Sequence, residues 1–232
     1  MAGRIEISPE EIAQVKERYP SLGYSGDGLW EGPFKLDATY DGKQIIDLFR
    51  IQIIAGENYP NRIPALREVG GRVLAITSKH RVELADVHYN ASSNTACVCV
   101  KQEETARFPP GSKLPTFIED LVIPYLYGLS FFNEIGRWPW AEFSHGGLGL
   151  LEFYAQDSIA PTREDLIEVG KLIRSDPNWR EYSKQLRRPS SGRKCPCGSR
   201  QPISECHYGV WHGINSLHTH LKRLGLKPRQ II

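Results

Sequence analysis

Four residues of the kind that bind soft metal ions lie close together near the end of the chain. Cys195 and Cys197 are separated by one proline, and eight residues then lead to the adjacent pair Cys206 and His207. Three thiolates and one imidazole are typical ligands of a closed, tetrahedral structural zinc site. A bound metal can fold a segment that is too small to bury a core of its own. The spacing therefore predicts a structural Zn²⁺ site at Cys195, Cys197, Cys206 and His207.

The five cysteines of this chain of 232 residues fall in two close clusters. That distribution argues against a disulfide framework and for reduced thiols, as in the cytoplasm. The first residues contain no apolar signal segment, and no apolar run approaches the length of a membrane span, so we expect a cytoplasmic protein without membrane attachment. The net charge of +2 gives no strong case for a nucleic-acid partner. The length suits one well-buried domain plus an appendage.

The first part of the chain predicts a helix and then antiparallel strands. Ser8 is a favourable N-cap for a helix that should end before Pro20. The expected elements that follow are a glycine-rich turn at 24–30, a strand at 30–40, a hairpin turn at Asp41 and Gly42, a strand at 44–54 and a short strand at 72–76. Four strands packed against helices give an α+β fold class.

The later part of the chain predicts helices. Thr116 is expected to cap a helix over 117–132, which Pro124 should kink. Residues 137–149 are expected to form a packed loop, anchored by Trp138 and Trp140. Further helices are expected at 162–174, 178–187 and 211–224, the last packed on the metal cluster.

A basic segment separates the last two of these helices. Residues 187–194 are rich in Arg, Ser, Pro and Gly, which is the composition of a linker. We therefore expect two domains: residues 1–186 as the main domain with a helical extension, and residues 187–232 as a linker and a zinc-binding module.

The other two cysteines follow a His-x-Asn step at His88 and Asn90, after a short polar turn. Side chains alternate between the two sides of an extended strand. In a strand over 95–100, Thr95, Cys97 and Cys99 would face outward, and Ala96, Val98 and Val100 would face the core. A thiol near the surface, with His88 and Asn90 close by, is a candidate nucleophile for covalent catalysis. The alternative is that both cysteines are small, half-buried apolar residues.

The order of these features resembles the ubiquitin-conjugating enzymes over about residues 8–155. The shared landmarks are an N-terminal helix, a strand meander, a Tyr-Pro-x-x-x-Pro segment from Tyr59 to Pro64, the His-x-Asn step, a short loop and a cysteine. The family has His-Pro-Asn and a turn glycine before its cysteine. Asn94 can take that glycine's place, because Asn tolerates left-handed backbone angles. This alignment favours Cys97 with a loop one residue shorter than the common pattern, whereas Cys99 makes the loop one residue longer and stays a candidate.

The resemblance implies an acyl transferase. Cys97 would carry a protein C-terminus as a thioester and pass it to an amine, with Cys99 as the alternative nucleophile. Asn90 would hydrogen-bond the oxyanion that forms when the amine attacks. His88 would hold the backbone near Asn90 without transferring protons.

Residues 151–154, Leu-Glu-Phe-Tyr, resemble a segment of bacterial relatives of the conjugating enzymes that are found in antiphage operons. That resemblance implies a role in antiviral defence, in which the C-terminus of a cyclic-oligonucleotide synthase is attached to targets. An activating enzyme would be a further partner. A ubiquitin-like modifier from a dedicated bacterial operon fits the residues equally well.

The C-terminal cluster resembles the SEC-C zinc motif, which has Cys-x-Cys, eight residues and Cys-His, with Gly-Ser directly after the second cysteine. Arg200 stands where that motif often has glycine. Such motifs are usually interaction modules. This leaves a second hypothesis, a non-catalytic scaffold or binding protein that has the conjugating-enzyme fold and uses the zinc module for recruitment.

Overall fold

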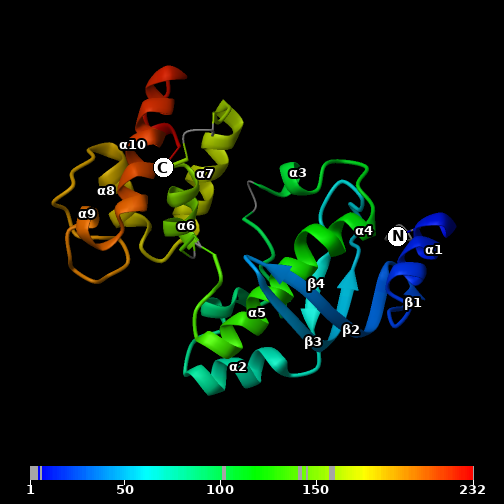
Figure 1. The fold of residues 1–232 in the computed structure, drawn as a ribbon. Helices are drawn as coiled ribbons and strands as arrows, with labels where there is room; N and C mark the ends of the chain where they lie inside the picture. The colour runs from blue at the N-terminus through cyan, green and yellow to red at the C-terminus, as the bar shows by residue number, and fades with distance from the viewer. Residues whose placement is uncertain are drawn as a thin grey trace. The chain divides into compact units, whose positions relative to one another are not determined.

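The computed structural model describes residues 5, 7–100, 103–140, 143–144, 146–156 and 160–231. The chain forms two compact units, Met1–Ala141 and Glu142–Ile232, and each is described by itself below (Figure 1). The boundary expected at residue 187 therefore lies inside the second unit. The described part of the chain contains no helix that is both long and apolar enough to cross a membrane.

The first unit contains a four-stranded antiparallel sheet. Its strands follow chain order: β1 (Gly23–Gly26), β2 (Leu29–Tyr40), β3 (Lys43–Ile54) and β4 (Ala65–Glu68). The hairpin turn predicted at Asp41 and Gly42 is confirmed, since both residues have positive φ angles, 47° and 76°, and Tyr40 pairs with Lys43. The segment expected to be only a turn at 24–30 instead contributes β1, which pairs with the start of β2. The predicted α+β class, with four antiparallel strands and several helices, is confirmed.

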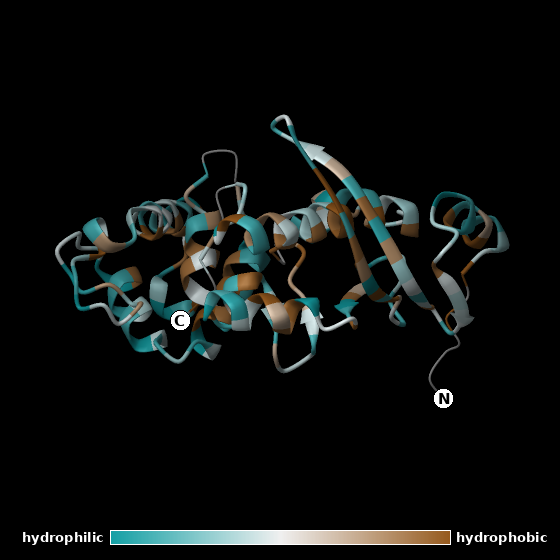
Figure 2. Cartoon of the chain, turned by 60° about the horizontal axis from the view of Figure 1, so that its bottom comes forward, coloured by the Kyte–Doolittle hydropathy of each residue, from teal (hydrophilic) through white to brown (hydrophobic). Residues whose placement is uncertain are grey.

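One face of this sheet builds the core of the first unit. Along β2 and β3 the buried residues alternate with exposed ones, as the period of a strand requires. Figure 2 shows the apolar residues of the long strands interleaved with hydrophilic ones. The buried side chains include Trp30, Phe34, Leu36, Phe49, Ile51 and Ile53.

The N-terminal helix α1 (Pro9–Arg18) has the predicted start and end. The Ser8 hydroxyl accepts a hydrogen bond from the backbone N–H of Glu11 at 3.2 Å. The buried Glu11 carboxylate in turn accepts hydrogen bonds from the Tyr59 hydroxyl and, at 2.6 Å, from the backbone N–H of Leu114. Glu11 therefore joins α1 to two later segments of the first unit.

Residues 72–76 form a helix, and the strand predicted there is wrong. Helix α2 (Arg72–His80) begins after Gly71 and buries Val73, Ile76 and Thr77. Those positions follow a helical period, whereas Leu74 is exposed. The carboxylate of Glu68 accepts the backbone N–H of Val73 at 3.2 Å, so it satisfies one of the free donors at the start of the helix.

A long helical segment crosses the first unit after a short helix, α3 (Glu104–Arg107). It consists of α4 (Leu114–Phe117), the π-helical turn η3 (Ile118–Val122) and α5 (Ile123–Ile135). The segment begins before the predicted cap Thr116, with Lys113 as its N-cap. The irregularity expected at Pro124 is a π-helical turn that comes just before it.

The second unit is helical. Its elements are α6 (Gly146–Phe153), α7 (Arg163–Ser175), α8 (Trp179–Arg187), α9 (Ile203–Cys206), α10 (Tyr208–Arg223) and the 3-10 turn η4 (Pro228–Gln230). The three helices predicted at 162–174, 178–187 and 211–224 are present, and Thr162 caps α7 with Asp165 in a capping box.

The glycine-rich segment after residue 145 belongs to helix α6, although it was expected to be a loop. Its glycines permit close packing, since an added Cβ at Gly149 would be 1.6 Å from the carbonyl oxygen of Ser144. Gly213 of α10 in turn lies so near α6 that an added Cβ there would be 1.6 Å from the carbonyl oxygen of Leu151. The segment 187–194, where a linker was expected, is attached to its neighbours by hydrogen bonds. Arg193 Nη1 donates to the Lys184 carbonyl at 2.8 Å, and the Arg193 carbonyl accepts from Ile203 N at 2.8 Å.

Candidate functional site

A small hairpin in the first unit carries the His-x-Asn step and the first cysteine cluster. It follows the 3-10 turn η1 (Ala85–Val87) and pairs β5 (Tyr89–Asn90) with β6 (Thr95–Ala96). Asn94 has a φ angle of 53°, so the left-handed turn position predicted for it is confirmed. The backbone N–H of Cys97 donates to the His88 carbonyl at 2.7 Å and extends the pairing by one residue.

The turn that leads into this hairpin is held from two sides. Trp138 Nε1 donates to the carbonyl of Asp86 at 3.0 Å, and the buried Tyr125 hydroxyl donates to the carbonyl of Val87 at 3.2 Å. Together with the His88 carbonyl, three consecutive carbonyl groups are therefore bonded to three different segments. Such pre-organisation fixes the position of the residues that follow.

Tyr89 fastens the hairpin loop itself. The hydroxyl of the buried Tyr89 side chain donates to the Asn94 carbonyl at 3.0 Å, and burial raises the pKa of this hydroxyl. Tyr89 thus remains a neutral donor at physiological pH.

His88 has a structural position. Its φ angle is 51°, and its ring packs edge-on against the ring of Trp138 with 4.8 Å between the centroids. This arrangement agrees with the backbone-holding role expected from the sequence.

The strand predicted to continue through Cys99 ends at Ala96. Ala96 and Val98 pack against the core as expected, but Cys99, which was expected to face outward, also packs against it. Burial, followed by the negative charge of Glu104, raises the pKa of the Cys99 thiol to about 12. The half-buried Cys97 thiol donates to the Cys99 carbonyl at 3.7 Å.

Asn90 lies on the outward side of the hairpin. Tyr89 pairs with Ala96 on the core side, so Asn90 and its partner Thr95 face the other way. Cys97 follows directly after β6, and its backbone N–H still pairs with the His88 carbonyl, two residues before Asn90.

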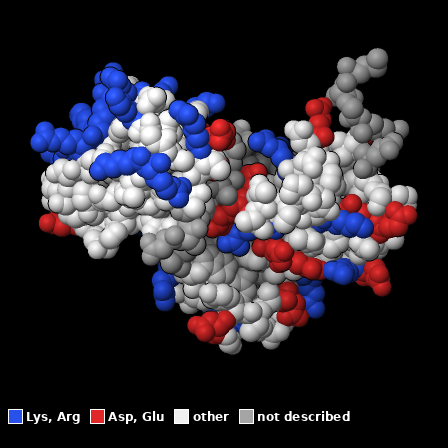
Figure 3. Space-filling view, turned by 90° about the horizontal axis from the view of Figure 1, so that it is seen from above, with Lys and Arg blue, Asp and Glu red and all other residues white. Residues whose placement is uncertain are grey.

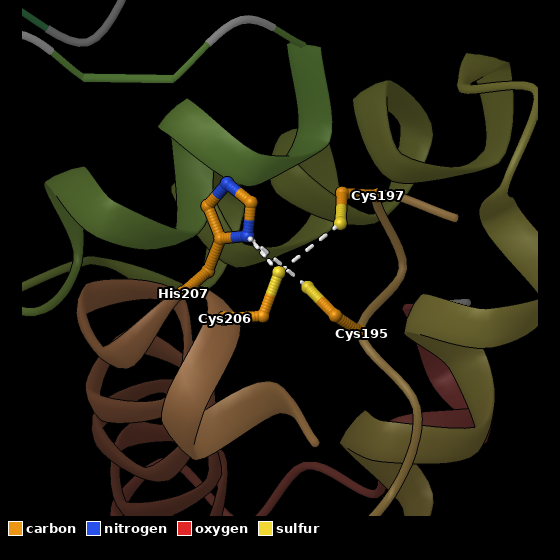
Figure 4. A group of neighbouring side chains, drawn as sticks. All are labelled: Cys195, Cys197, Cys206 and His207. Atoms are coloured by element: carbon orange, nitrogen blue, oxygen red, sulfur yellow. Dashed lines mark hydrogen bonds between the residues drawn. The ribbon is translucent and has the colours of Figure 1, made fainter. Parts of the chain in front are cut away.

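The second cysteine cluster brings its four predicted ligands together. The three sulfur atoms and a ring nitrogen of His207 all lie within 4.8 Å of one another, and Figure 4 shows them converging on one point. His207 Nδ1 lies 3.2 Å from the sulfur atoms of both Cys195 and Cys206, and the Cys197 and Cys206 sulfur atoms are 3.5 Å apart. These four residues form a metal-binding candidate, as predicted.

Two short backbone segments position these ligands. Cys195 and Cys197 lie in a loop that is closed by the bond from Cys195 N to the Gln201 carbonyl, at 2.8 Å. Cys206 ends helix α9, and His207 directly precedes α10. The loop contains two left-handed residues, Gly198 with a φ angle of 87° and Arg200 with a φ angle of 65°. Because a residue with a Cβ is strained at the positive φ angle of Arg200, glycine suits this position better.

Ser199 was not singled out from the sequence, yet its groups surround two of the ligand sulfur atoms. Its backbone N–H donates to the Cys197 sulfur at 3.4 Å, and its hydroxyl lies 3.0 Å from the Cys206 sulfur. Although burial opposes the change, the hydrogen bonds from Ser199 lower the pKa of Cys197 to about 7. Burial raises the pKa of Cys195 to about 12. In the sequence, the Gly-Ser step directly after the second cysteine was the feature that could have indicated this supporting role of Ser199.

The residues that hold the hairpin were not predicted from the sequence. Tyr125 was expected in a helix and Trp138 in a packed loop, and nothing in their spacing indicated bonds to the carbonyl groups of Val87 and Asp86. Comparisons with protein-family models, with curated proteins and with solved structures gave no match.

Proposed function

We propose that this protein is a ubiquitin-conjugating-like acyl transferase in which Cys97 carries a protein C-terminus as a thioester. The observation that carries the proposal is the difference between the two thiols of the hairpin. Cys97 directly follows the hairpin and is bonded to it through the His88 carbonyl, whereas Cys99 packs against the core with a raised pKa. A nucleophile needs access to its substrate and a sufficient thiolate fraction, and Cys99 is poor in both.

The arrangement of the first unit supports a conjugating-enzyme-like fold. An N-terminal helix, a four-stranded meander, the His-x-Asn hairpin and a long helix follow one another in the order that the resemblance implies. Helix α2 stands between the meander and the hairpin, where the sequence predicted a strand.

The proposed reaction has two steps. The Cys97 thiolate first attacks an activated C-terminal carbonyl, forms the C–S bond of a thioester and displaces the group that activated the carbonyl. An acceptor amine then attacks the thioester carbonyl, the C–S bond breaks, and the products are an amide and the Cys97 thiol. The Asn90 carboxamide would donate a hydrogen bond to the oxyanion of the second step, and the activating group would come from a partner activating enzyme.

His88 and the residues around it have a positioning role in this proposal. The backbone of His88 pairs with that of Cys97, and its ring packs on Trp138. The thiol and the carboxamide would thus be held in place before the substrate arrives, which avoids an entropic cost in the transition state.

The metal of the second cluster is proposed to be Zn²⁺. Tetrahedral zinc bound at about 2.3 Å to sulfur places neighbouring sulfur atoms about 3.8 Å apart, close to the separations in this cluster. Cys195, Cys197 and Cys206 would bind through sulfur and His207 through Nδ1. Four protein ligands leave no open position, so the ion would have a structural role and take no part in the acyl transfer.

The biological setting is proposed from the sequence resemblance. Relatives in antiphage operons imply a bacterial defence role, with a cyclic-oligonucleotide synthase as the protein whose C-terminus is carried. The second candidate cargo is a ubiquitin-like modifier from a dedicated bacterial operon.

The experiment that tests the proposal is intact mass spectrometry after coexpression with the neighbouring genes. We expect an adduct on the wild-type protein that reductant removes, with the mass of the transferred polypeptide. Cys97→Ser should lose this adduct or retain it as a stable ester, while Cys99→Ser should keep the reducible adduct. Loss of the adduct in Cys99→Ser alone would transfer the role to Cys99. The absence of any adduct difference between wild type and both variants would leave the non-catalytic scaffold as the better account.

A further inference from the structure

Basic residues are concentrated in the last part of the chain. Residues 180–232 contain eleven Lys and Arg and only two Asp and Glu, a net charge of +9, whereas residues 1–179 contain 18 and 25, a net charge of −7. The whole-chain value of +2 therefore conceals two opposite parts. Figure 3 shows Lys and Arg side chains gathered over the second unit, at the left of the view.

Helix α8 presents a row of these cations on one face. Arg180, Lys184, Arg187 and Arg188 are exposed, and they follow the i, i+4, i+7, i+8 spacing of one helix face. The opposite face buries Tyr182, Ser183, Gln185 and Leu186. At 1.5 Å per residue the row extends over roughly 12 Å.

The basic run that follows α8 is fixed beside it. The backbone N–H of Ser190 donates to Gln185 Oε1 at 3.2 Å, and the Arg193 guanidinium reaches the Lys184 carbonyl. The turn η4 also packs against α8, with exposed Lys227 and Arg229 at its start and in its middle. Two segments about forty residues apart in sequence therefore bring their cations to one surface.

Carboxylates neutralise little of this charge. Among the Lys and Arg side chains that the structure describes after Trp179, the only ion pair joins Lys184 to Glu181, at 2.6 Å. The cations that lack an ion pair include Arg187, Arg188, Lys194, Lys227 and Arg229. Several unpaired cations held in one row attract a partner with regularly spaced negative charges.

We propose that this basic surface, formed by α8, the segment 188–194 and η4, binds the phosphate backbone of a single-stranded nucleic acid. Arginine, the residue best suited to phosphate, supplies seven of the eleven cations of residues 180–232. The exposed Trp179 at the start of α8 lies under the guanidinium of Arg180, 5.7 Å from the ring centroid, and offers a face on which a base can stack.

Two other anionic partners fit less well. A membrane surface requires a band of exposed apolar side chains beside the cations, and among the described residues of the second unit the large exposed apolar side chains are only Ile167, Trp179 and Tyr208. An acidic protein partner requires an apolar centre to its interface, which the same scarcity disfavours. The proposal is independent of the thioester chemistry.

The test uses the full-length protein and a fluorescein-labelled 20-nucleotide single strand, as DNA and as RNA, in fluorescence anisotropy at several NaCl concentrations. The charge-removing variant Arg180→Gln, Arg187→Gln, Arg188→Gln changes only exposed side chains. Its matched control, Lys16→Gln, Arg62→Gln, Arg137→Gln, removes the same charge from exposed positions of the first unit. We expect the α8 variant to bind at least tenfold more weakly than wild type and to lose about 2 from the slope of log K against log salt, since each phosphate contact contributes about 0.7.

The control variant should bind like wild type, and both variants should keep their metal and their thermal unfolding midpoint. No binding by wild type in 50 mM NaCl would overturn the proposal, as would equal weakening in the two variants. Stronger binding to vesicles of an anionic phospholipid than to either strand would identify a membrane surface instead and would also overturn it. A difference between DNA and RNA would identify the natural strand.

Discussion

The two cysteine clusters use the same side chain in opposite ways. In the hairpin, Cys97 and Cys99 are two residues apart and differ in environment, because one is bonded to the hairpin backbone and the other packs against the core. In the second unit, Cys195 and Cys197 are equally close in sequence, yet they share one environment with Cys206 of a separate segment, since all three sulfur atoms converge with His207 Nδ1.

The supports of the clusters differ in the same way. The hairpin depends on aromatic side chains that donate to backbone carbonyls, and its geometry is complete without any ligand. The metal-ligand cluster has one buried cysteine, and its thiols lie within hydrogen-bonding distance of one another. A bound metal ion would hold these thiols together far more strongly. Metal removal should therefore affect one cluster and spare the other.

The largest expected effect follows replacement of a metal ligand. Cys206→Ser should abolish stoichiometric zinc binding, because a three-ligand remnant binds weakly, and should expose residues 188–207 to hydrogen exchange. Structural zinc contributes on the order of 10 kcal/mol in isolated fingers, so a large loss of stability in the second unit is expected. Elemental analysis and hydrogen–deuterium exchange mass spectrometry measure both effects.

Cys99→Ser is the matched control, since it makes the same change in the other cluster and should retain the metal. The first unit should keep wild-type exchange in both variants. A Cys206→Ser protein with a full equivalent of zinc would contradict the assigned ligand set.

A second prediction separates the two thiols of the hairpin. With a pKa of about 12, Cys99 has about one ten-thousandth of its thiol ionised at pH 8, and only the thiolate reacts with iodoacetamide. Peptide mapping should show Cys97 alkylated at least a hundredfold faster than Cys99 at pH 8. The rate at Cys99 should rise tenfold per pH unit up to about pH 12.

The metal ligands provide the internal comparison in the same experiment. Cys195, Cys197 and Cys206 should be protected in the zinc-bound protein and should react after chelation, while the Cys97 rate stays unchanged. Equal rates at Cys97 and Cys99 would show that the core does not shield Cys99.

The raised pKa of Cys99 also has a consequence for stability. A thiol whose pKa is higher in the folded state than the usual value near 9 favours folding while it is protonated. That contribution is complete below pH 9 and is lost as the pH rises toward 12. Cys99→Ser should therefore flatten the decline of the thermal midpoint over that range.

A third prediction concerns the support of the hairpin. An added Cβ at Gly128 would lie 2.0 Å from Cζ3 of Trp138, so Gly128→Ala must displace the indole that donates to Asp86. Overpacking of this kind costs about 1–3 kcal/mol, although alanine otherwise favours a helix. Urea unfolding should show the loss, and the yield of the reducible Cys97 adduct should fall with it.

Gly56→Ala is the matched control in the same unit, because a Cβ there meets no atom within 4 Å. It should leave both stability and adduct yield close to those of wild type. An unchanged adduct yield in Gly128→Ala would mean that the hairpin does not depend on Trp138.

Local signals in the sequence predicted much of this molecule. The caps at Ser8 and Thr162, the Asp41-Gly42 turn and the ligand spacing each act within a few residues, so a short pattern is enough to identify them. The strand predicted at residues 72–76 is wrong because a short apolar run fits a strand or a buried helix equally well.

The features that the sequence did not predict depend on contacts with residues far away in the chain. The glycines of α6 suggested a loop, yet small residues also permit helices to pack closely, and Gly147 lies against Tyr182 of α8, far along the chain. The basic segment 187–194 has the composition of a linker, and only its hydrogen bonds to Gln185, Lys184 and Ile203 show that it is fixed. The whole-chain charge likewise could not reveal the basic surface of α8.

The smallest expected effect tests the backbone of the metal cluster. Arg200 has a left-handed φ angle of 65°, which costs a residue with a Cβ about 1 kcal/mol and costs glycine nothing. Glycine also loses more entropy on folding, so Arg200→Gly should stabilise the second unit by about 0.5 kcal/mol and slow the release of zinc to a chelator. Arg188→Gly is the matched control, because Arg188 has a negative φ angle of −148°, at which a Cβ causes no left-handed strain. There the same replacement should destabilise the unit, since glycine brings only its entropic cost. If the two variants change the free energy of unfolding with opposite signs, backbone strain at Arg200, and not the loss of a charge, limits the stability of the metal-ligand cluster. Equal signs would assign the effect to charge.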